Sequence, residues 1–226
     1  MSNDFGKSVF QSIQFANENN LLYQAGCPSS LIPTDNFKKM SLKANSYREL
    51  YDCAICYQDF NLMLFDKSFF QFSEMAKEQE VRLAYFPNPY SFSESLAHRQ
   101  AANEMLERSE ISLDEFEQII SEETFSCDIP IIRYDLSQKQ YCEMRHPTAH
   151  FHIGFFSENR WPSRRVMTPM SFFLKVLRLY YSGLWDEIDQ KQGNCLDELY
   201  RTEIAKCPLV TEDYFSKTEA QRFFFT

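Results

Sequence analysis

Three of the four histidines in this 226-residue chain fall within seven residues, in the run Arg145-His146-Pro147-Thr148-Ala149-His150-Phe151-His152. Imidazole is the side chain that most readily binds a metal ion or moves a proton near neutral pH. If the segment is a strand, His150 and His152 lie on the same face, because side chains alternate between the two faces of a strand. This histidine block is therefore the first candidate for a functional site.

Metal binding is one chemistry that the block could support. An H-x-H pair on a strand often forms half of a metal site, because both rings can reach one ion at about 2 Å. His146 precedes Pro147, whose ring favours an extended backbone at the preceding residue and could turn His146 back toward the pair. The candidate ligands of a divalent metal ion are therefore His146, His150 and His152, with Glu143 or Asp135 as a further ligand.

A metal-free alternative uses the same block for acid–base catalysis on a phosphate ester. One histidine would act as general base and another as general acid, while arginines hold the phosphate and stabilise developing charge. Arginine suits this task because its planar fork matches two phosphate oxygens. Arg133 and Arg145 would hold the phosphate, and Glu143 or Asp135 would orient a histidine. Further arginines that could contact phosphate or nucleic acid are Arg160, Arg164 and Arg165.

The charge distribution supports a phosphate ligand at this place and argues against one elsewhere. The whole chain carries a formal charge of −9. Residues 133–178 contain eight basic and three acidic residues, a local charge of +5 that leaves −14 for the rest of the chain. A protein that coats nucleic acid with its whole surface is therefore excluded. Nucleic acid or a nucleotide remains a candidate partner for the basic stretch alone.

Several common enzyme classes are excluded by missing motifs. The sequence has five glycines and contains neither a glycine-rich phosphate loop nor a dinucleotide fingerprint. It also lacks the nucleophile-elbow, zinc-protease and deaminase patterns. Seven irregularly spaced cysteines, no signal-like start and no apolar run of about 18 residues predict a cytoplasmic protein with reduced thiols and no membrane partner. We expect the single pair Cys53-Ala54-Ile55-Cys56 to be structural and to lie in a strand.

Periodicity and turn residues predict the elements that must position the block. Apolar residues at helical spacing predict an amphipathic helix within residues 5–24, and Thr168 before Pro169 predicts the start of a helix that ends near Gly183. Other helices are expected at 74–80 and 93–124, a connector at 28–33, and strands at 50–58, 60–65, 68–73, 82–86, 130–135, 141–145 and 149–156. Together they predict one α+β domain, residues 1–226, with a curved, mainly antiparallel sheet packed by N-terminal and C-terminal helices.

Several segments together carry a family resemblance. They are Tyr51 and Tyr57, Phe65-Asp66, Phe70-Gln71-Phe72, residues 82–89, Arg133-Tyr134-Asp135, His146-Pro147, His150, His152, and Pro169 with Phe172. With these segments the chain resembles the uncharacterised bacterial family named domain of unknown function 2290, over most of its length. The resemblance implies a bacterial cytoplasmic protein. Because members of such families often lie in mobile-element or anti-phage operons, it also implies a role in defence.

A weaker similarity is to the small TumE-type toxins of bacterial toxin–antitoxin modules. The shared order is an R-Y/W-D strand, a turn, an H-P pair and then two further histidines. This resemblance would place Arg133, Asp135, His146, His150 and His152 in the core of the toxin. The chain departs from the pattern because it is much longer and lacks a doubled histidine before the strand.

Two functional hypotheses follow. The first is a defence or toxin-type enzyme, of nuclease or phosphodiesterase type, that cleaves or modifies a nucleic acid or nucleotide through the histidine block. The second is a non-catalytic sensor or adaptor that docks an ATPase or nuclease encoded in the same operon. An acidic surface, an aromatic content of 16% and the lack of a complete catalytic motif favour the second, and the tail Phe223-Phe224-Phe225 could contact such a partner. A metal-stabilised structural domain without chemistry is the third interpretation.

Overall fold

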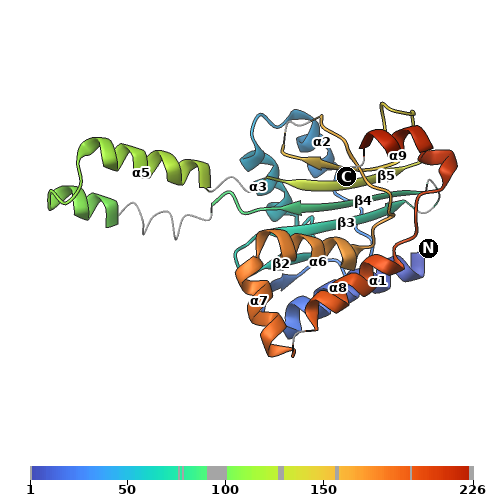
Figure 1. The fold of residues 1–226 in the computed structure, drawn as a ribbon, viewed down its shortest axis with the longest axis horizontal. Helices are drawn as coiled ribbons and strands as arrows, with labels where there is room; N and C mark the ends of the chain where they lie inside the picture. The colour runs from blue at the N-terminus through green and yellow to red at the C-terminus, as the bar shows by residue number, and fades with distance from the viewer. Residues whose placement is uncertain are drawn as a thin grey trace.

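The computed structural model describes residues 2–75, 77, 79–90, 101–126, 130–155, 158–193 and 195–223. Its described part contains an open seven-stranded sheet in which every neighbouring pair is antiparallel and the strands follow chain order (Figure 1). The α+β class, the antiparallel sheet and the flanking N-terminal and C-terminal helices are therefore confirmed. The strands are β1 (Leu22–Ala25), β2 (Leu62–Leu64), β3 (Phe69–Met75), β4 (Glu80–Phe86), β5 (Ile132–Ser137), β6 (Ala149–Ile153) and β7 (Trp161–Pro162).

One face of the sheet is covered by helices from both ends of the chain. These helices are α1 (Ser2–Glu18), α6 (Pro169–Tyr180) and α8 (Leu196–Lys206) (Figure 1). Helix α6 begins where the sequence predicts, because the Thr168 side chain and Ser171 form a reciprocal capping box and Pro169 follows the cap. The rings of Phe70, Phe172 and Phe173 are fully buried in this core. The apolar stripe of α6 thus fixes the sheet from this side.

Helices α2 (Asp35–Lys43) and α3 (Tyr47–Tyr57) build a second, smaller core on the opposite face. Phe69 of β3 stacks on Phe86 of β4 there, with ring centroids 4.7 Å apart. The sheet residues of this core come from β2, β3, β4 and the residue before β5. Along β5 and β6 the same face instead carries polar side chains, and these form the site described below.

The remaining elements lie at the periphery. They are α5 (Leu113–Ser126), α7 (Ser182–Lys191), the 3₁₀ turn Glu212–Tyr214 and α9 (Lys217–Phe223), and residues 101–107 are also helical. In Figure 1, α5 stands away from the sheet. Ser112 and Glu115 form a reciprocal capping box at the start of α5. No helix among the described residues is long and apolar enough to span a membrane.

Several predicted elements are wrong. The predicted strand 50–58 is helix α3, because Ser46 caps it and Leu50, Tyr51 and Ala54 pack one helical face on the sheet. Both cysteines of the C-x-x-C pair therefore lie in a helix, with free thiols, Cys53 buried and Cys56 exposed. The N-terminal helix ends at Glu18, before the edge strand β1.

Three further boundaries differ from the prediction. The described residues of 74–80 are not helical, because β3 continues to Met75 and pairs with β4 from Glu80. The predicted strand 141–145 is a loop that makes one isolated bridge, between Cys142 and His146. Gly183 lies inside α7, because α6 already ends at Tyr180. Residues 91–100, Phe156, Phe224 and Phe225, to which predictions were also assigned, lie outside the described residues.

A histidine and arginine cluster on the sheet

The pairing of β5 with β6 brings the histidine pair next to two of the predicted site residues. In this antiparallel register Arg133 lies opposite His152, and Asp135 lies opposite His150. All four positions share one face, because residues two apart on a strand point the same way. The histidines are almost fully buried, with exposed fractions of 1% for His150 and 8% for His152.

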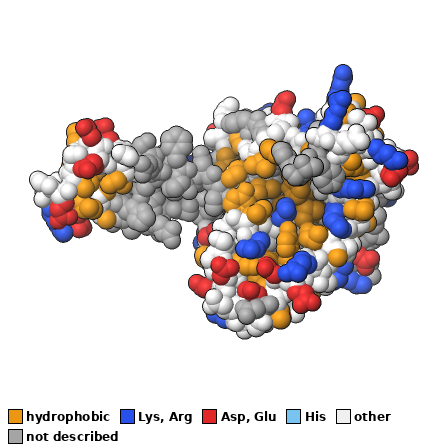
Figure 2. Space-filling view, viewed as in Figure 1, with side chains coloured by type: hydrophobic (Ala, Val, Ile, Leu, Met, Phe, Trp, Pro, Cys, Tyr) orange, Lys and Arg blue, Asp and Glu red, His pale blue; other side chains and the backbone are white. Residues whose placement is uncertain are grey.

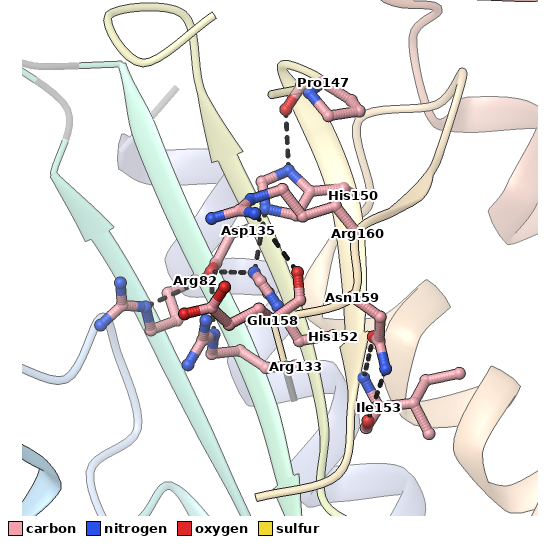
Figure 3. A network of polar contacts seen from close by, with 10 residues as sticks. All are labelled: Arg82, Arg133, Asp135, Pro147, His150, His152, Ile153, Glu158, Asn159 and Arg160. Carbon is pink, nitrogen blue, oxygen red and sulfur yellow. Dashed lines mark hydrogen bonds and ion pairs between the residues drawn. The ribbon is translucent and has the colours of Figure 1, made fainter. Parts of the chain in front are cut away.

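The two imidazoles contact each other directly (Figure 3). Their Nε2 atoms are 3.0 Å apart, and Nδ1 of His150 lies 2.8 Å from the backbone oxygen of Pro147. A carbonyl only accepts, so Nδ1 of His150 donates to it, and Nε2 of a neutral His150 carries the lone pair. Nε2 of His152 therefore holds the proton that the two rings share. That same atom lies 3.5 Å from Oδ2 of Asp135.

Guanidinium groups surround the carboxylate of Asp135. Nε of Arg133 donates to Oδ2 at 2.8 Å, and Nε of Arg82 donates to Oδ1 at 3.0 Å from the neighbouring strand β4. Arg160, next to β7, lies beside His150 in Figure 3 and donates to the backbone oxygen of Glu158 at 3.2 Å. We call Arg82, Arg133, Asp135, His150, His152 and Arg160 the sheet cluster.

The comparisons with known proteins give one match. A family model described as "Uncharacterized conserved protein (DUF2290)" matches residues 15–225. The chain belongs to this family. No curated protein matches the chain, and no solved structure matches it either. The description of this family names no activity.

Burial and neighbouring charges set the protonation of the sheet cluster. Burial, followed by repulsion from Arg133, lowers the pKa of His152 to about 4. Burial also lowers the pKa of His150 and of His146. Burial alone would raise the pKa of Asp135, but the adjacent Arg133 and Arg82 outweigh it and hold this pKa below its ordinary value. At neutral pH the cluster therefore combines neutral histidines with an ionised carboxylate.

A metal ion fits part of this arrangement. One ligand atom each from Asp135, His150 and His152 can be chosen so that all three lie within 4.8 Å of one another. The hydrogen bond from His150 to a backbone carbonyl is also the usual support of a metal-binding imidazole. Against a divalent cation, both oxygens of Asp135 already accept from arginines, and Figure 3 shows three guanidiniums beside only two carboxylates, those of Asp135 and Glu158. The net positive charge of the cluster suits an anion better than a cation.

Other predicted site residues lie outside the sheet cluster. Glu143 and Arg145 are exposed on the loop that replaces the predicted strand. His146 is adjacent, with its ring centroid 4.9 Å from that of His150, and its Nδ1 has no hydrogen-bond partner among the described residues. This loop is held by the fully buried Glu219 of α9, which accepts hydrogen bonds from the Tyr141 hydroxyl and the Met144 amide.

Two predicted phosphate contacts lie elsewhere, and one cluster residue was missed. Arg165 donates to the backbone oxygens of Ile204 and Cys207 at the end of α8, and Arg164 lines a cavity beside it. Arg82 was assigned no role from the sequence. Its place opposite Asp135 follows from the β4–β5 register, which joins residues 53 positions apart.

The neutral state of His152 predicts a pH dependence of stability. Because the pKa of His152 falls to about 4 on folding, from an ordinary 6.5, the unfolded chain binds a proton that the folded chain does not. Stability is therefore complete above about pH 6.5 and falls as the pH drops toward about 4. We expect the urea midpoint to fall more between about pH 7.5 and about pH 5 in the wild type than in His152→Gln. Equal falls in both proteins would contradict the buried neutral histidine.

Proposed function

We propose that this protein binds a phosphodiester or a nucleotide at the sheet cluster and cleaves it by acid–base catalysis, as a bacterial defence or toxin-type enzyme. The observation that carries the proposal is the pair of neutral histidines, 3.0 Å apart, under an excess of guanidinium groups. The defence role rests on the family resemblance and on nothing in the geometry.

The guanidiniums supply the binding half of this chemistry. The side chains of Arg82 and Arg133 are 59% and 39% exposed, so their outer nitrogens can reach a ligand while Nε stays on Asp135. Arg160 is exposed, and the hydrogen bond described for it goes to a backbone oxygen. Three such groups can bind phosphate oxygens in two-pronged fashion and stabilise charge as it develops on them.

The histidine pair supplies the proton transfer. In the proposed step an attacking hydroxyl or water oxygen gives its proton to the pair as the new P–O bond forms. The bond to the leaving oxygen breaks, and that oxygen takes the proton back from the pair, so protons balance over the reaction. The negative charge of Asp135, 3.5 Å from Nε2 of His152, favours the transient imidazolium. Substrate must approach from the side of Arg82 and Arg160, the exposed members of the cluster.

The test is turnover of single-stranded RNA, single-stranded DNA, cyclic nucleotides and bis(p-nitrophenyl) phosphate, with chelator and with added divalent ions. We expect a turnover that survives chelator and is lost from the His150→Ala/His152→Ala double variant. Arg145→Ala is the matched control and should retain it, because Arg145 is exposed outside the cluster.

Two outcomes would overturn the proposal. Full turnover in the double variant would show that His150 and His152 take no part in catalysis. Loss in chelator with recovery in one divalent ion, together with stoichiometric metal by elemental analysis, would replace acid–base catalysis with a metal site at Asp135, His150 and His152.

The acidic helical segment favours a second candidate function, a non-catalytic adaptor. Residues 101–126 contain eight acidic residues and one basic residue, and α5 stands away from the sheet (Figure 1). Such a segment suits a basic surface on a partner, for which an ATPase or nuclease encoded in the same operon is the candidate. In that case the partner would co-purify with the wild type and with the histidine double variant alike.

A further inference from the structure

A second basic site lies on the opposite side of β6. A cavity of about 370 Å³ opens between β6, α6 and α8. Phe151 lines it, and this residue points away from the histidines because it lies between them on the strand. On this side of the sheet, the Phe151 ring stacks against the Phe172 ring of α6, with ring centroids 6.5 Å apart. The cavity and the sheet cluster are therefore separated by the sheet itself.

The lining of this cavity carries an unbalanced positive charge. Four basic side chains line it, and none of its described lining residues is acidic. They are Arg164, Arg165, Lys175 and Arg201. Figure 2 shows Lys and Arg side chains set among hydrophobic ones on the face that carries α6 and α8. Like charges this close repel one another, so the arrangement is stabilised when an anion binds between them.

Among the four basic side chains of the cavity, Lys175 gives the strongest support for a bound anion. It is half-buried on α6, beside the buried face of the helix, and its ammonium lies 5.9 Å from the ring centroid of Phe151. It makes no ion pair among the described residues, and burial lowers its pKa. A partly buried ammonium without a carboxylate partner is uncommon, because its desolvation is uncompensated.

Among the described residues, two neighbouring cations on the same helices form ion pairs with acidic side chains, unlike the cations that line the cavity. Nε of Arg178 on α6 lies 3.6 Å from Oδ1 of Asp197, and Nζ of Lys206 on α8 lies 2.6 Å from Oε1 of Glu203. Arg201 lies between these two acids on α8 and yet forms no ion pair among the described residues. The cations that face the cavity are thus the ones left for an external anion.

We propose that this cavity binds a small phosphate ester, of the size of a mononucleotide, through Lys175, Arg201 and Arg164. The volume lies near the lower end of the range of small-molecule sites, about 300–1,000 Å³. Tyr200 and Phe151 add aromatic surface beside the cations, which suits the organic part of such a ligand. Arg165 contributes charge, but its Nη1 nitrogen already donates hydrogen bonds to two backbone oxygens. This site does not depend on the function proposed for the sheet cluster.

The experiment is calorimetric titration of the full chain with adenosine monophosphate and with inorganic phosphate at low ionic strength. We expect both Lys175→Met and Arg201→Ala to weaken binding by about tenfold or more. Lys191→Met, an exposed lysine on α7, is the charge-matched control and should bind as the wild type does. Near-ultraviolet circular dichroism of each variant shows whether the fold is kept, and Arg201→Ala changes an exposed side chain that leaves the core intact.

The His150→Ala/His152→Ala variant separates this proposal from the proposed function. Unchanged binding in that variant, with loss in Lys175→Met and Arg201→Ala, would place the ligand in the cavity even if no turnover is ever found. Loss in the histidine variant alone would assign the phosphate to the sheet cluster and overturn the cavity site. No heat of binding in the wild type with either probe would overturn it as well.

Discussion

Replacing Asp135 by asparagine is expected to lower kcat for phosphodiester cleavage by about 10²–10⁴-fold, the range for losing a positioned acid–base contribution. The change removes the charge that faces Nε2 of His152 and the acceptor that aligns Arg82 and Arg133. Asparagine keeps the size of the side chain, and both arginines are exposed enough to be solvated, so the fold should persist. Asp135 thus acts as a positioning residue for the histidine pair.

The pH profile separates this role from a structural one. Asp135 raises the pKa of His152, so its loss lowers that pKa further and moves the acidic limb of the kcat profile to lower pH. A purely structural defect would lower kcat at every pH without moving the limb. Asp135→Glu should recover part of the rate, because it restores the charge. A normal kcat in Asp135→Asn would refute the role.

Gly26→Ala is expected to destabilise the protein by about 3 kcal/mol or more, the upper end of the range for overpacking. Gly26 follows the edge strand β1 and donates its amide to the backbone oxygen of Asn61 at 2.9 Å. A Cβ at this position would lie 2.1 Å from the backbone oxygen of Phe60 and 2.9 Å from its ring. Because a backbone oxygen cannot rotate away, β1 must separate from β2.

A glycine in an open position supplies the matched control. Gly6 lies within α1, and an added Cβ would meet nothing within 4 Å among the atoms considered. Gly6→Ala should therefore stabilise the protein by about 0.5–1 kcal/mol, the helix-propensity difference. Urea unfolding of both variants measures the two effects. Similar midpoints for Gly26→Ala and the wild type would show that β1 is not held as described.

Part of the candidate site could be predicted because its information is local. The two-residue period of a strand placed His150 and His152 on one face, and they are in contact. The cap at Thr168 likewise depends on residues within one helical turn. A similar local signal was overlooked at Ser46 and Glu49, which have the spacing of a capping box and mark the start of α3 where a strand was predicted.

The rest of the candidate site depends on contacts between residues that are far apart in the sequence. The sequence by itself determined the family and the α+β class. It also showed that several imidazoles lie close together in one short segment. Tertiary structure decided that Arg82 joins that block and that Arg164 lies across the sheet from it, beside Lys175. The physical reason is that strand register and helix packing are set by long-range burial of apolar faces. Local periodicity shows which face a residue occupies, whereas the pairing of distant strands decides what it meets there.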